Sequence, residues 1–347
     1  MIEHEIYMKR CLQLAKNGLG TTYPNPLVGS VIVHNGKIIG EGWHKKAGEP
    51  HAEVNAINSV KNKELLSEST IYVSLEPCSH FGKTPPCANL IIEHKIPKVV
   101  IGCIDSYSEV AGKGIEKLTN AGCKVTLNIL KKECLEINKR FFTFHNKKRP
   151  YIILKWAETA DGFIAPLQNE TKTSIAISNQ YSRQLVHKYR TEEQAILAGT
   201  NTVLNDNPNL DAREWFGRNP TRVIVDRSSK IPVDFNVKNK NNPTIIFTEE
   251  ENCVNSENCI YEFTIFDSLL ISNILTELYK KNIQSIIIEG GTFTLQQFID
   301  RNLWDEAHVF ISENNSIEGI KKPDFNFNPN QKIKIKNNQL KIFTNYD

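Results

Sequence analysis

The hydrophobic positions of this chain alternate between helical and strand periodicity from one segment to the next. Over residues 6–14, apolar side chains recur every three or four positions, which predicts an amphipathic helix. Apolar runs at residues 28–33 and 37–42 flank Asn35-Gly36, and this dipeptide between two such runs predicts a β-hairpin. The same patterns predict further helices at residues 51–60, 87–94, 112–121 and 131–145, and further strands at residues 70–75, 98–103 and 124–127.

The second half repeats this alternation beyond a basic, proline-containing run at residues 147–150, near which we place a domain boundary. We predict strands at residues 151–156, 195–198, 222–225, 244–247 and 285–288, and helices at residues 179–190, 266–281 and 292–300. Strands alternating with helices indicate α/β domains whose sheets are covered on both faces. Residues 249–258 and 313–347 are rich in Asn, Lys and Glu, so we expect solvated loops or frayed ends there.

Composition narrows the class of protein. A chain of 347 residues is long enough for two domains, and none of its apolar runs reaches the length of a membrane span. The N-terminus lacks the apolar core of a secretory signal, so we expect the cytosol, where the eight cysteines stay reduced and any special ones are metal ligands. The net charge of +3 comes from lysines scattered among acids, so we expect neither a nucleic acid nor a membrane as partner.

Four residues carry the clearest chemistry of the chain. His51 and Glu53 in Pro-His-Ala-Glu, followed by Cys78 after a proline and by Cys87, match the H-x-E and P-C…C pattern of zinc-dependent base deaminases. Three ligands, His51, Cys78 and Cys87, leave a tetrahedral position of zinc open for water, as catalysis requires. Glu53 would accept a proton from the attacking water, deliver it to the ring nitrogen and help protonate the departing ammonia.

Two simpler interpretations compete with this one. Cys78 and Cys87 are ordinary buried thiols if no zinc is bound, and a structural zinc needs a fourth ligand that His44 or His80 can supply. Neither alternative explains Glu53 or the Pro-Cys placement. We expect the remaining cysteines to be small core residues: Cys11, Cys103, Cys123, Cys134, Cys253 and Cys259.

Eight residues separate Cys78 from Cys87, whereas the common deaminase pattern Pro-Cys-x-x-Cys has only two between its cysteines. With this long spacing, the first half resembles the bifunctional deaminase-reductase family of riboflavin biosynthesis. The other stretches that carry the resemblance are Asn25-Pro26-Leu27-Val28-Gly29, residues 42–53 and Gly112-Lys113-Gly114-Ile115. The resemblance implies a cytidine-deaminase-like three-layer domain over residues 1–146 and a dihydrofolate-reductase-like domain over residues 147–347.

The second half is similar to the reductase of that family over residues 149–300. The matching stretches are Arg149-Pro150-Tyr151, Leu154-Lys155, Asp161-Gly162, Gly199 with Thr202, Asp206-Asn207-Pro208, Leu210, Arg213 and Glu289-Gly290-Gly291. The resemblance implies that Lys155 is catalytic and that substrate contacts lie at Ser174, Arg190, Leu210, Arg213 and Glu289. It places NADPH contacts at Ala157, Thr202, Asp206, Ser228 and the loop 290–297, which includes Gly290 and Gly291. The chain departs from the family at Ala176, where tryptophan is common, and at Asn201, where glycine is usual.

Elementary chemistry supports part of this assignment. The planar forks of Arg190 and Arg213 suit a sugar phosphate, and Gly290-Gly291 between a strand and a helix lets backbone amides approach a cofactor phosphate.

The resemblance implies two consecutive reactions. Zinc-dependent deamination of 2,5-diamino-6-(ribosylamino)pyrimidinone 5′-phosphate would come first, and NADPH would then reduce the ribosyl group to ribityl. We therefore expect Zn²⁺ and NADPH as cofactors, a phosphorylated pyrimidine as small-molecule partner, and a homo-oligomer. The alternatives are a single-activity nucleobase or nucleic-acid deaminase with an inactive or divergent second domain, and a zinc-stabilised binding protein without activity.

Overall fold

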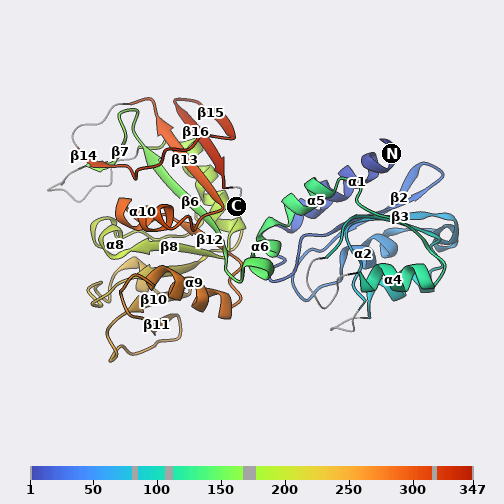
Figure 1. The fold of residues 1–347 in the computed structure, drawn as a ribbon, viewed down its shortest axis with the longest axis horizontal. Coiled ribbons are helices and arrows are strands. Elements are labelled where there is room, and N and C mark those ends of the chain that lie inside the picture. Colours follow the sequence, from blue (N-terminus) through green and yellow to red (C-terminus); the bar gives the residue numbers. More distant parts are fainter. Residues whose placement is uncertain (1, 80–84, 106–111, 167–176, 315–318, 346–347) are drawn as a thin grey trace. The chain divides into compact units, whose positions relative to one another are not determined.

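The chain forms two compact units, Met1–Lys147 and Lys148–Asp347 (Figure 1). The computed structural model describes residues 2–79, 85–105, 112–166, 177–314 and 319–345. Within these ranges, no helix combines the length and the apolar character needed to cross a bilayer.

The first unit is built on a sheet in the order β2-β1-β3-β4-β5, in which β1 is antiparallel to both of its neighbours and β3, β4 and β5 are parallel. Its elements are α1 (Ile2–Ala15), β1 (Gly29–His34), β2 (Lys37–Trp43), α2 (Ala52–Ser59), β3 (Thr70–Leu75), α3 (Cys87–Glu93), β4 (Lys98–Cys103), α4 (Lys113–Asn120), β5 (Lys124–Thr126), α5 (Lys131–Ile137) and α6 (Lys139–Lys147), with short 3-10 helices at Lys16–Gly18 and Lys63–Glu68. The predicted hairpin is confirmed, because β1 and β2 pair through His34 and Lys37 around Asn35-Gly36, both with positive φ.

Both faces of this sheet are covered by helices, as expected. Successive residues of β1 point to opposite faces. Val31 and Val33 pack with α1 and α5, while Ile32 packs with α2, α3 and α4. The unit is therefore a three-layer α/β/α domain, and the three helices on the Ile32 face are the ones that frame the candidate metal site.

The single helix predicted over residues 131–145 is wrong, because the structure has two helices that meet at Asn138. The buried Asn138 amide accepts a hydrogen bond from the Leu27 N–H (2.7 Å) and donates one to the Leu27 carbonyl (2.9 Å). A side chain that binds distant backbone in this way competes with the helical ladder. The break therefore reflects a tertiary contact that local periodicity does not show.

The second unit has a sheet in the order β11-β10-β9-β8-β12-β6-β13-β16-β15, which is parallel as far as β13 and antiparallel from there to β15. Its elements are β6 (Tyr151–Glu158), β7 (Phe163–Pro166), α7 (Gln180–Glu192), β8 (Ala195–Gly199), α8 (Thr200–Asp206), β9 (Thr221–Val225), a 3-10 helix (Asn236–Lys238), β10 (Thr244–Thr248), β11 (Cys259–Phe263), α9 (Leu270–Lys280), β12 (Ser285–Ile288), α10 (Thr292–Asp300), β13 (Glu306–Ser312), β14 (Gly319–Lys321), β15 (Gln331–Ile335) and β16 (Asn338–Thr344). Periodicity did not predict β7, β11, β13 or α8.

Helices cover both faces of this sheet too. On one face, Leu197 and Ile288 pack with apolar side chains of α9 and α10. On the other, Ile196 and Ile224 pack with Val203 of α8 and with the loops that follow it, and α7 lies beside them. The strands are buried on both sides, which explains why they read as nearly continuous apolar runs in the sequence.

The expectation of loops or frayed ends over residues 313–347 is wrong, because this segment contains β14, β15 and β16. Strand β16 pairs with β13 along its length, and Leu340, opposite Phe310, is fully buried. Asn and Lys dominate the composition, but isoleucine and leucine occupy alternate positions at Ile333 and Ile335 and again at Leu340 and Ile342. The polar composition of residues 313–347 as a whole therefore concealed the alternation of apolar and polar residues that is typical of strands.

We predict that the C-terminal strand is needed for stability. Leu340→Ala should lower the free energy of unfolding by about 2–5 kcal/mol, because it leaves a cavity against Val186 and Phe310. Denaturant titration measures the change, with the exposed Lys332→Ala on β15 as the matched control. Equal stability of the two variants would show that the strand contributes little.

Candidate zinc and cofactor sites

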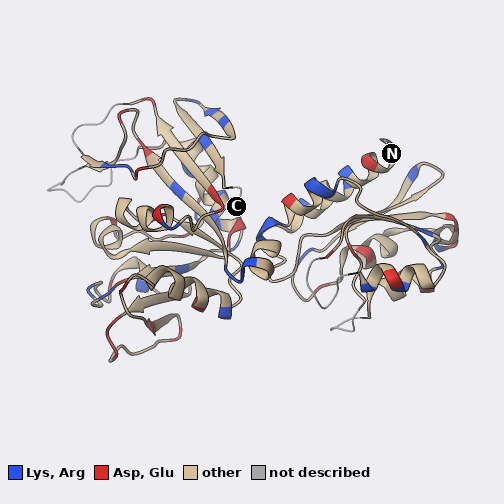
Figure 2. Ribbon diagram, in the orientation of Figure 1, with Lys and Arg blue, Asp and Glu red and all other residues tan. Residues whose placement is uncertain are grey.

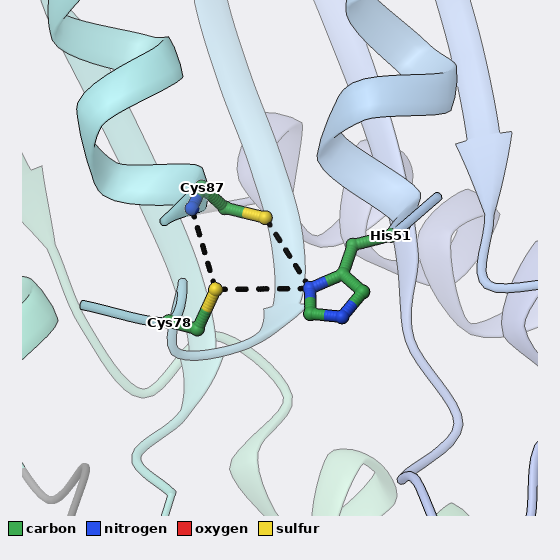
Figure 3. Close-up of side chains that lie close together, drawn as sticks. All are labelled: His51, Cys78 and Cys87. Atoms are coloured by element: carbon green, nitrogen blue, oxygen red, sulfur yellow. Dashed lines mark hydrogen bonds between the residues drawn. The ribbon is translucent and has the colours of Figure 1, made fainter. Parts of the chain in front are cut away.

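The three predicted metal ligands lie at the ends of separate elements of the first unit. His51 occupies the N-cap position of α2 with an extended backbone, Cys78 follows the central strand β3, and Cys87 is the first residue of α3. Their Nδ1 and two Sγ atoms all lie within 4.8 Å of one another, and they form the single cluster of this kind among the described residues. Figure 3 shows both sulfur atoms directed at the His51 ring.

The spacing of the three ligand atoms fits a tetrahedral zinc ion. His51 Nδ1 lies 3.7 Å from Cys78 Sγ and 3.4 Å from Cys87 Sγ. Bond lengths of about 2.0–2.1 Å for nitrogen and about 2.3 Å for sulfur put tetrahedral N and S ligands about 3.6 Å apart. The donor set of one imidazole and two thiols is one that zinc prefers, so the residues present fit the metal.

The two thiols differ in acidity because they interact. The pKa of Cys78 is lowered, mainly by a hydrogen bond with the Cys87 thiol. Hydrogen bonds with His51 and with the Cys87 backbone N–H lower it further. The same contact with Cys78, together with burial, raises the pKa of Cys87. Cys78 is therefore the first of the pair to become a thiolate, the form in which cysteine binds a metal.

Glu53 lies in the first turn of α2, two residues after His51, and only 3% of its surface is exposed. Burial raises the pKa of its carboxyl to about 7, and the neighbouring Cys78 adds to this effect. A carboxyl whose pKa lies near neutral pH can both accept and donate a proton. Glu53 is not one of the three ligands, and its carboxyl interacts with the Cys87 thiol, so it lies beside the candidate metal position without being part of the ligand set.

His44 does not complete a four-ligand structural site. Its Nε2 accepts from Asn25 Nδ2 (3.0 Å), and its Nδ1 donates to the Pro50 carbonyl (3.2 Å), so both ring nitrogens are engaged. His80, the other candidate, lies outside the described residues. Of the remaining cysteines, Cys123 and Cys253 are partly exposed, and the other four are buried as expected.

The second unit contains a cavity of about 960 Å³ at the carboxyl ends of β6, β8, β9 and β12. Ligands of open α/β sheets commonly bind at this edge. Seven of the individually predicted site residues line the cavity, as do residues 292–296 of the predicted loop 290–297: the seven are Lys155, Ala157, Thr202, Asp206, Glu289, Gly290 and Gly291. Asn201 also lines it.

The other predicted residues of this half lie elsewhere. Ser228 is exposed, and the cavity is lined instead by its neighbour Arg227. Leu210 is buried, whereas Arg213 is largely exposed and donates to Asp211 Oδ1 (2.6 Å). Ser174 and Ala176 lie outside the described residues.

A buried group of charges stands at one end of the cavity. Arg190 binds both carboxylate oxygens of Glu289, at 3.1 Å and 2.7 Å, and Lys155 Nζ lies 3.7 Å from Glu289 Oε2. Burial alone would raise the pKa of Glu289, but Arg190 and Lys155 lower it to about 2. Burial lowers the pKa of Lys155. Arg190 and Lys155 are positive and Glu289 is negative, so the group has a net charge of +1, which suits an anionic ligand.

The fork of Arg190 is therefore taken up by Glu289, and its Nη1 donates to the Asp211 carbonyl (2.9 Å). The sequence predicts that this fork binds a sugar phosphate. Binding through the same nitrogens requires the ion pair to open, and the contact with substrate stays a prediction.

Small residues shape the part of the cavity that faces the backbone. A Cβ on Gly290 would lie 3.1 Å from Gly199 N, and one on Gly199 would lie 2.7 Å from Thr294 Oγ1. Thr202 Oγ1 accepts from Gly291 N (2.9 Å). The turns after β8 and β12 thus lie close together and line the cavity with backbone, an arrangement that fits a dinucleotide phosphate.

Sequence reasoning missed several lining residues. Arg227 supplies a cation at the end of β9, and its guanidinium is held by Glu249 Oε2 (2.7 Å). Phe266 adds aromatic surface, as does the largely exposed Phe293, which belongs to the predicted stretch 290–297. No local pattern marks Arg227 and Phe266, because they come from separate loops that only the fold brings together.

Comparison with known proteins supports both sites. The cytidine and deoxycytidylate deaminase zinc-binding region matches residues 1–103, and the RibD C-terminal domain matches residues 150–312. The riboflavin biosynthesis protein RibD of Aquifex aeolicus is 41% identical over 318 residues, which cover 90% of this chain and 88% of that protein. The chain belongs to the RibD family of riboflavin biosynthesis proteins. The RibD protein of Escherichia coli is 34% identical, and the aligned region covers 90% of this chain and 88% of that protein.

Solved structures of similar chains match both units of this fold. A Thermotoga maritima crystal structure, described as a diaminohydroxyphosphoribosylaminopyrimidine deaminase/5-amino-6-(5-phosphoribosylamino)uracil reductase, is 37% identical, with a TM-score of 0.89 and coverage of 99% of both chains. Acinetobacter baumannii RibD is 29% identical, with a TM-score of 0.88 and the same coverage.

Family membership confirms the resemblance found in the sequence. This RibD-family chain joins a zinc-binding deaminase domain to a reductase domain, and it serves riboflavin biosynthesis. Its cofactors are the zinc ion of His51, Cys78 and Cys87 and the NADPH used by the reductase.

We predict that Cys78→Ser removes zinc. A serine hydroxyl stays protonated at neutral pH and is a far poorer ligand than a thiolate, so metal analysis after dialysis should find much less than one zinc ion per chain. Cys123→Ser, which alters a thiol outside the ligand cluster, should retain the full amount. Equal zinc content in both variants would contradict the assigned ligand set.

Proposed function

We propose that the two units catalyse consecutive reactions on one phosphorylated aminopyrimidine. The first unit deaminates 2,5-diamino-6-(ribosylamino)pyrimidinone 5′-phosphate. The second reduces the ribosyl group of the product with NADPH and yields 5-amino-6-(5-phosphoribitylamino)uracil. The observation that carries the proposal is the presence, in one chain, of the His51-Cys78-Cys87 cluster with buried Glu53 and of a cavity lined by Lys155 and Glu289. The two activities in the description of the Thermotoga relative support it.

In the first unit, Glu53 is the proton carrier. Zinc, when bound, supplies a Lewis acid that makes water nucleophilic near neutral pH. Glu53 takes a proton from the attacking water, passes it to the ring nitrogen, and helps to protonate the departing ammonia. Its burial and its pKa of about 7 support both halves of this role.

In the second unit, Lys155 acts at the sugar. NADPH, when bound, supplies the hydride for C1′ of the opened ribose or its imine. Lys155 lies in the cavity with a lowered pKa, so it is suited to orient this centre or to protonate it. Glu289 holds Lys155 beside Arg190 and restricts where the ammonium group can lie.

The remaining contacts of the second unit are those that the family resemblance assigns to individual positions of this chain. Ala157, Thr202, Asp206, Ser228, Gly290 and Gly291 contact NADPH in this proposal, and Arg227, the neighbour of Ser228 that lines the cavity, supplies a cation for a cofactor phosphate. The family resemblance assigns the substrate contacts to Ser174, Arg190, Leu210, Arg213 and Glu289, and of these Glu289 lines the cavity. The excess positive charge of the Lys155–Arg190–Glu289 group supports a phosphorylated substrate.

A nucleic-acid deaminase is the rival function. Such an enzyme needs a basic or aromatic surface for the polynucleotide. Basic and acidic residues are interspersed along the described parts of both units (Figure 2), and the net charge is only +3. This distribution favours a small substrate. The homo-oligomeric state and the cytosolic location stay predictions of the sequence.

Product analysis tests the two-step proposal. Mass spectrometry of the diaminopyrimidine substrate should show exchange of one amino group for oxygen without NADPH, followed by gain of two hydrogens when NADPH is added. Glu53→Gln should retain zinc yet release ammonia at least about 100-fold more slowly, because it cannot carry the proton. Deamination at the wild-type rate by this variant would exclude Glu53 as the proton carrier.

Lys155→Met separates the second reaction from the first. On the deaminated substrate, we expect NADPH oxidation, followed by its absorbance, to fall about 100-fold or more, because an orienting or proton-donating group is lost. Ammonia release by the same variant serves as the internal control and should not change. Unchanged NADPH oxidation would remove Lys155 from the reaction.

A further inference from the structure

Glu76 is a buried carboxylate that neither reaction uses directly. It lies between the end of β3 and the metal ligand Cys78, and only 4% of its surface is exposed. Its backbone N–H donates to the Cys103 carbonyl at the end of β4 (3.0 Å). A buried charge is costly unless it is hydrogen-bonded, so its partners explain why it is tolerated there.

Three backbone N–H groups at the start of α4 donate hydrogen bonds to this carboxylate. Glu76 Oε2 accepts from Gly112 N (3.0 Å), and Oε1 accepts from Gly114 N (2.9 Å) and Ile115 N (3.3 Å). Gly112, at the N-cap position, has no side chain with which to cap the helix. Glu76 therefore serves as the cap of α4 from a position 36 residues earlier in the chain.

The helix also touches the segment that leads to the metal ligand. A Cβ on Gly114 would lie only 2.1 Å from the Pro77 carbonyl oxygen, so glycine allows α4 to pack directly on the backbone between Glu76 and Cys78. On its other side, Cys78 is held by α3, because Ala88 N donates to the Cys78 carbonyl (3.1 Å) and Cys87 N donates to its sulfur (3.3 Å).

We propose that Glu76 is a positioning residue for the zinc site: its carboxylate fastens α4 to the Glu76-Pro77-Cys78 segment and so holds the Cys78 sulfur at the metal. The inference rests on the zinc deaminase function proposed above. A carboxylate is required because it only accepts hydrogen bonds, whereas a glutamine amide would turn two N–H donors toward backbone N–H groups. Loosening the segment allows Cys78 to move away from His51 and Cys87.

The test compares Glu76→Gln with Glu116→Gln, which removes an exposed charge from the same helix. The zinc-loaded full chains are mixed with a chromogenic zinc chelator, well below their melting temperatures, and the rate of metal transfer is followed. We expect Glu76→Gln to release zinc about 10-fold faster or more, as for other residues that support metal ligands. Glu116→Gln should match the wild type.

Catalysis provides the second readout. With zinc in excess, kcat for ammonia release should fall in Glu76→Gln, while NADPH oxidation on the deaminated substrate stays at the wild-type rate. If the variant fails to fold, Gly114→Ala replaces it, since this change displaces α4 from Pro77 and leaves the carboxylate in place.

Two results overturn the positioning role. One is a zinc release rate equal to that of the wild type, even if the melting temperature falls, because Glu76 then only stabilises the fold. The other is faster zinc release with unchanged kcat at saturating zinc. Absence of ammonia release from the wild-type enzyme would instead contradict the proposed function, so the two failures are distinct.

Discussion

Three side chains from separate segments must meet at one zinc ion, and the arrangement of the first unit depends on this constraint. Cys78 and Cys87 follow His51 by 27 and 36 residues, so only the packed sheet and helices bring them together. Helices α2, α3 and α4 all pack on the same face of the sheet. Helix α2 begins with His51 and carries Glu53, and α3 begins with Cys87. Helix α4 is bound to the Cys78 segment through Glu76.

The second unit meets a similar demand with different chemistry. Its strands end at a common edge, where turns rich in glycine leave room for a dinucleotide. At that edge, Glu289 is stable as a carboxylate because Arg190 and Lys155 compensate for its burial. The same contacts fix the position of Lys155. In both units a buried carboxylate thus orders groups from distant segments, Glu76 through backbone N–H groups and Glu289 through cations.

How far the sequence predicts this architecture depends on the range of the interactions involved. The β1–β2 hairpin follows from Asn35-Gly36 and two apolar runs, because a tight turn is a local property. The break at Asn138 and the strand β16 could not be predicted in the same way. Each depends on a partner far along the chain, Leu27 for the first and β13 for the second.

By itself the sequence determined the zinc ligands and nominated Glu53 as the proton carrier, since zinc chemistry restricts both the residue types and their order. It also determined the two α/β domains, because burial on both sheet faces imposes a recognisable periodicity. Only the tertiary structure decided that Arg190 pairs with Glu289, that Arg227 rather than Ser228 lines the cavity, and that Glu76 caps α4. These are contacts between residues distant in the chain, and spacing along the sequence does not encode them.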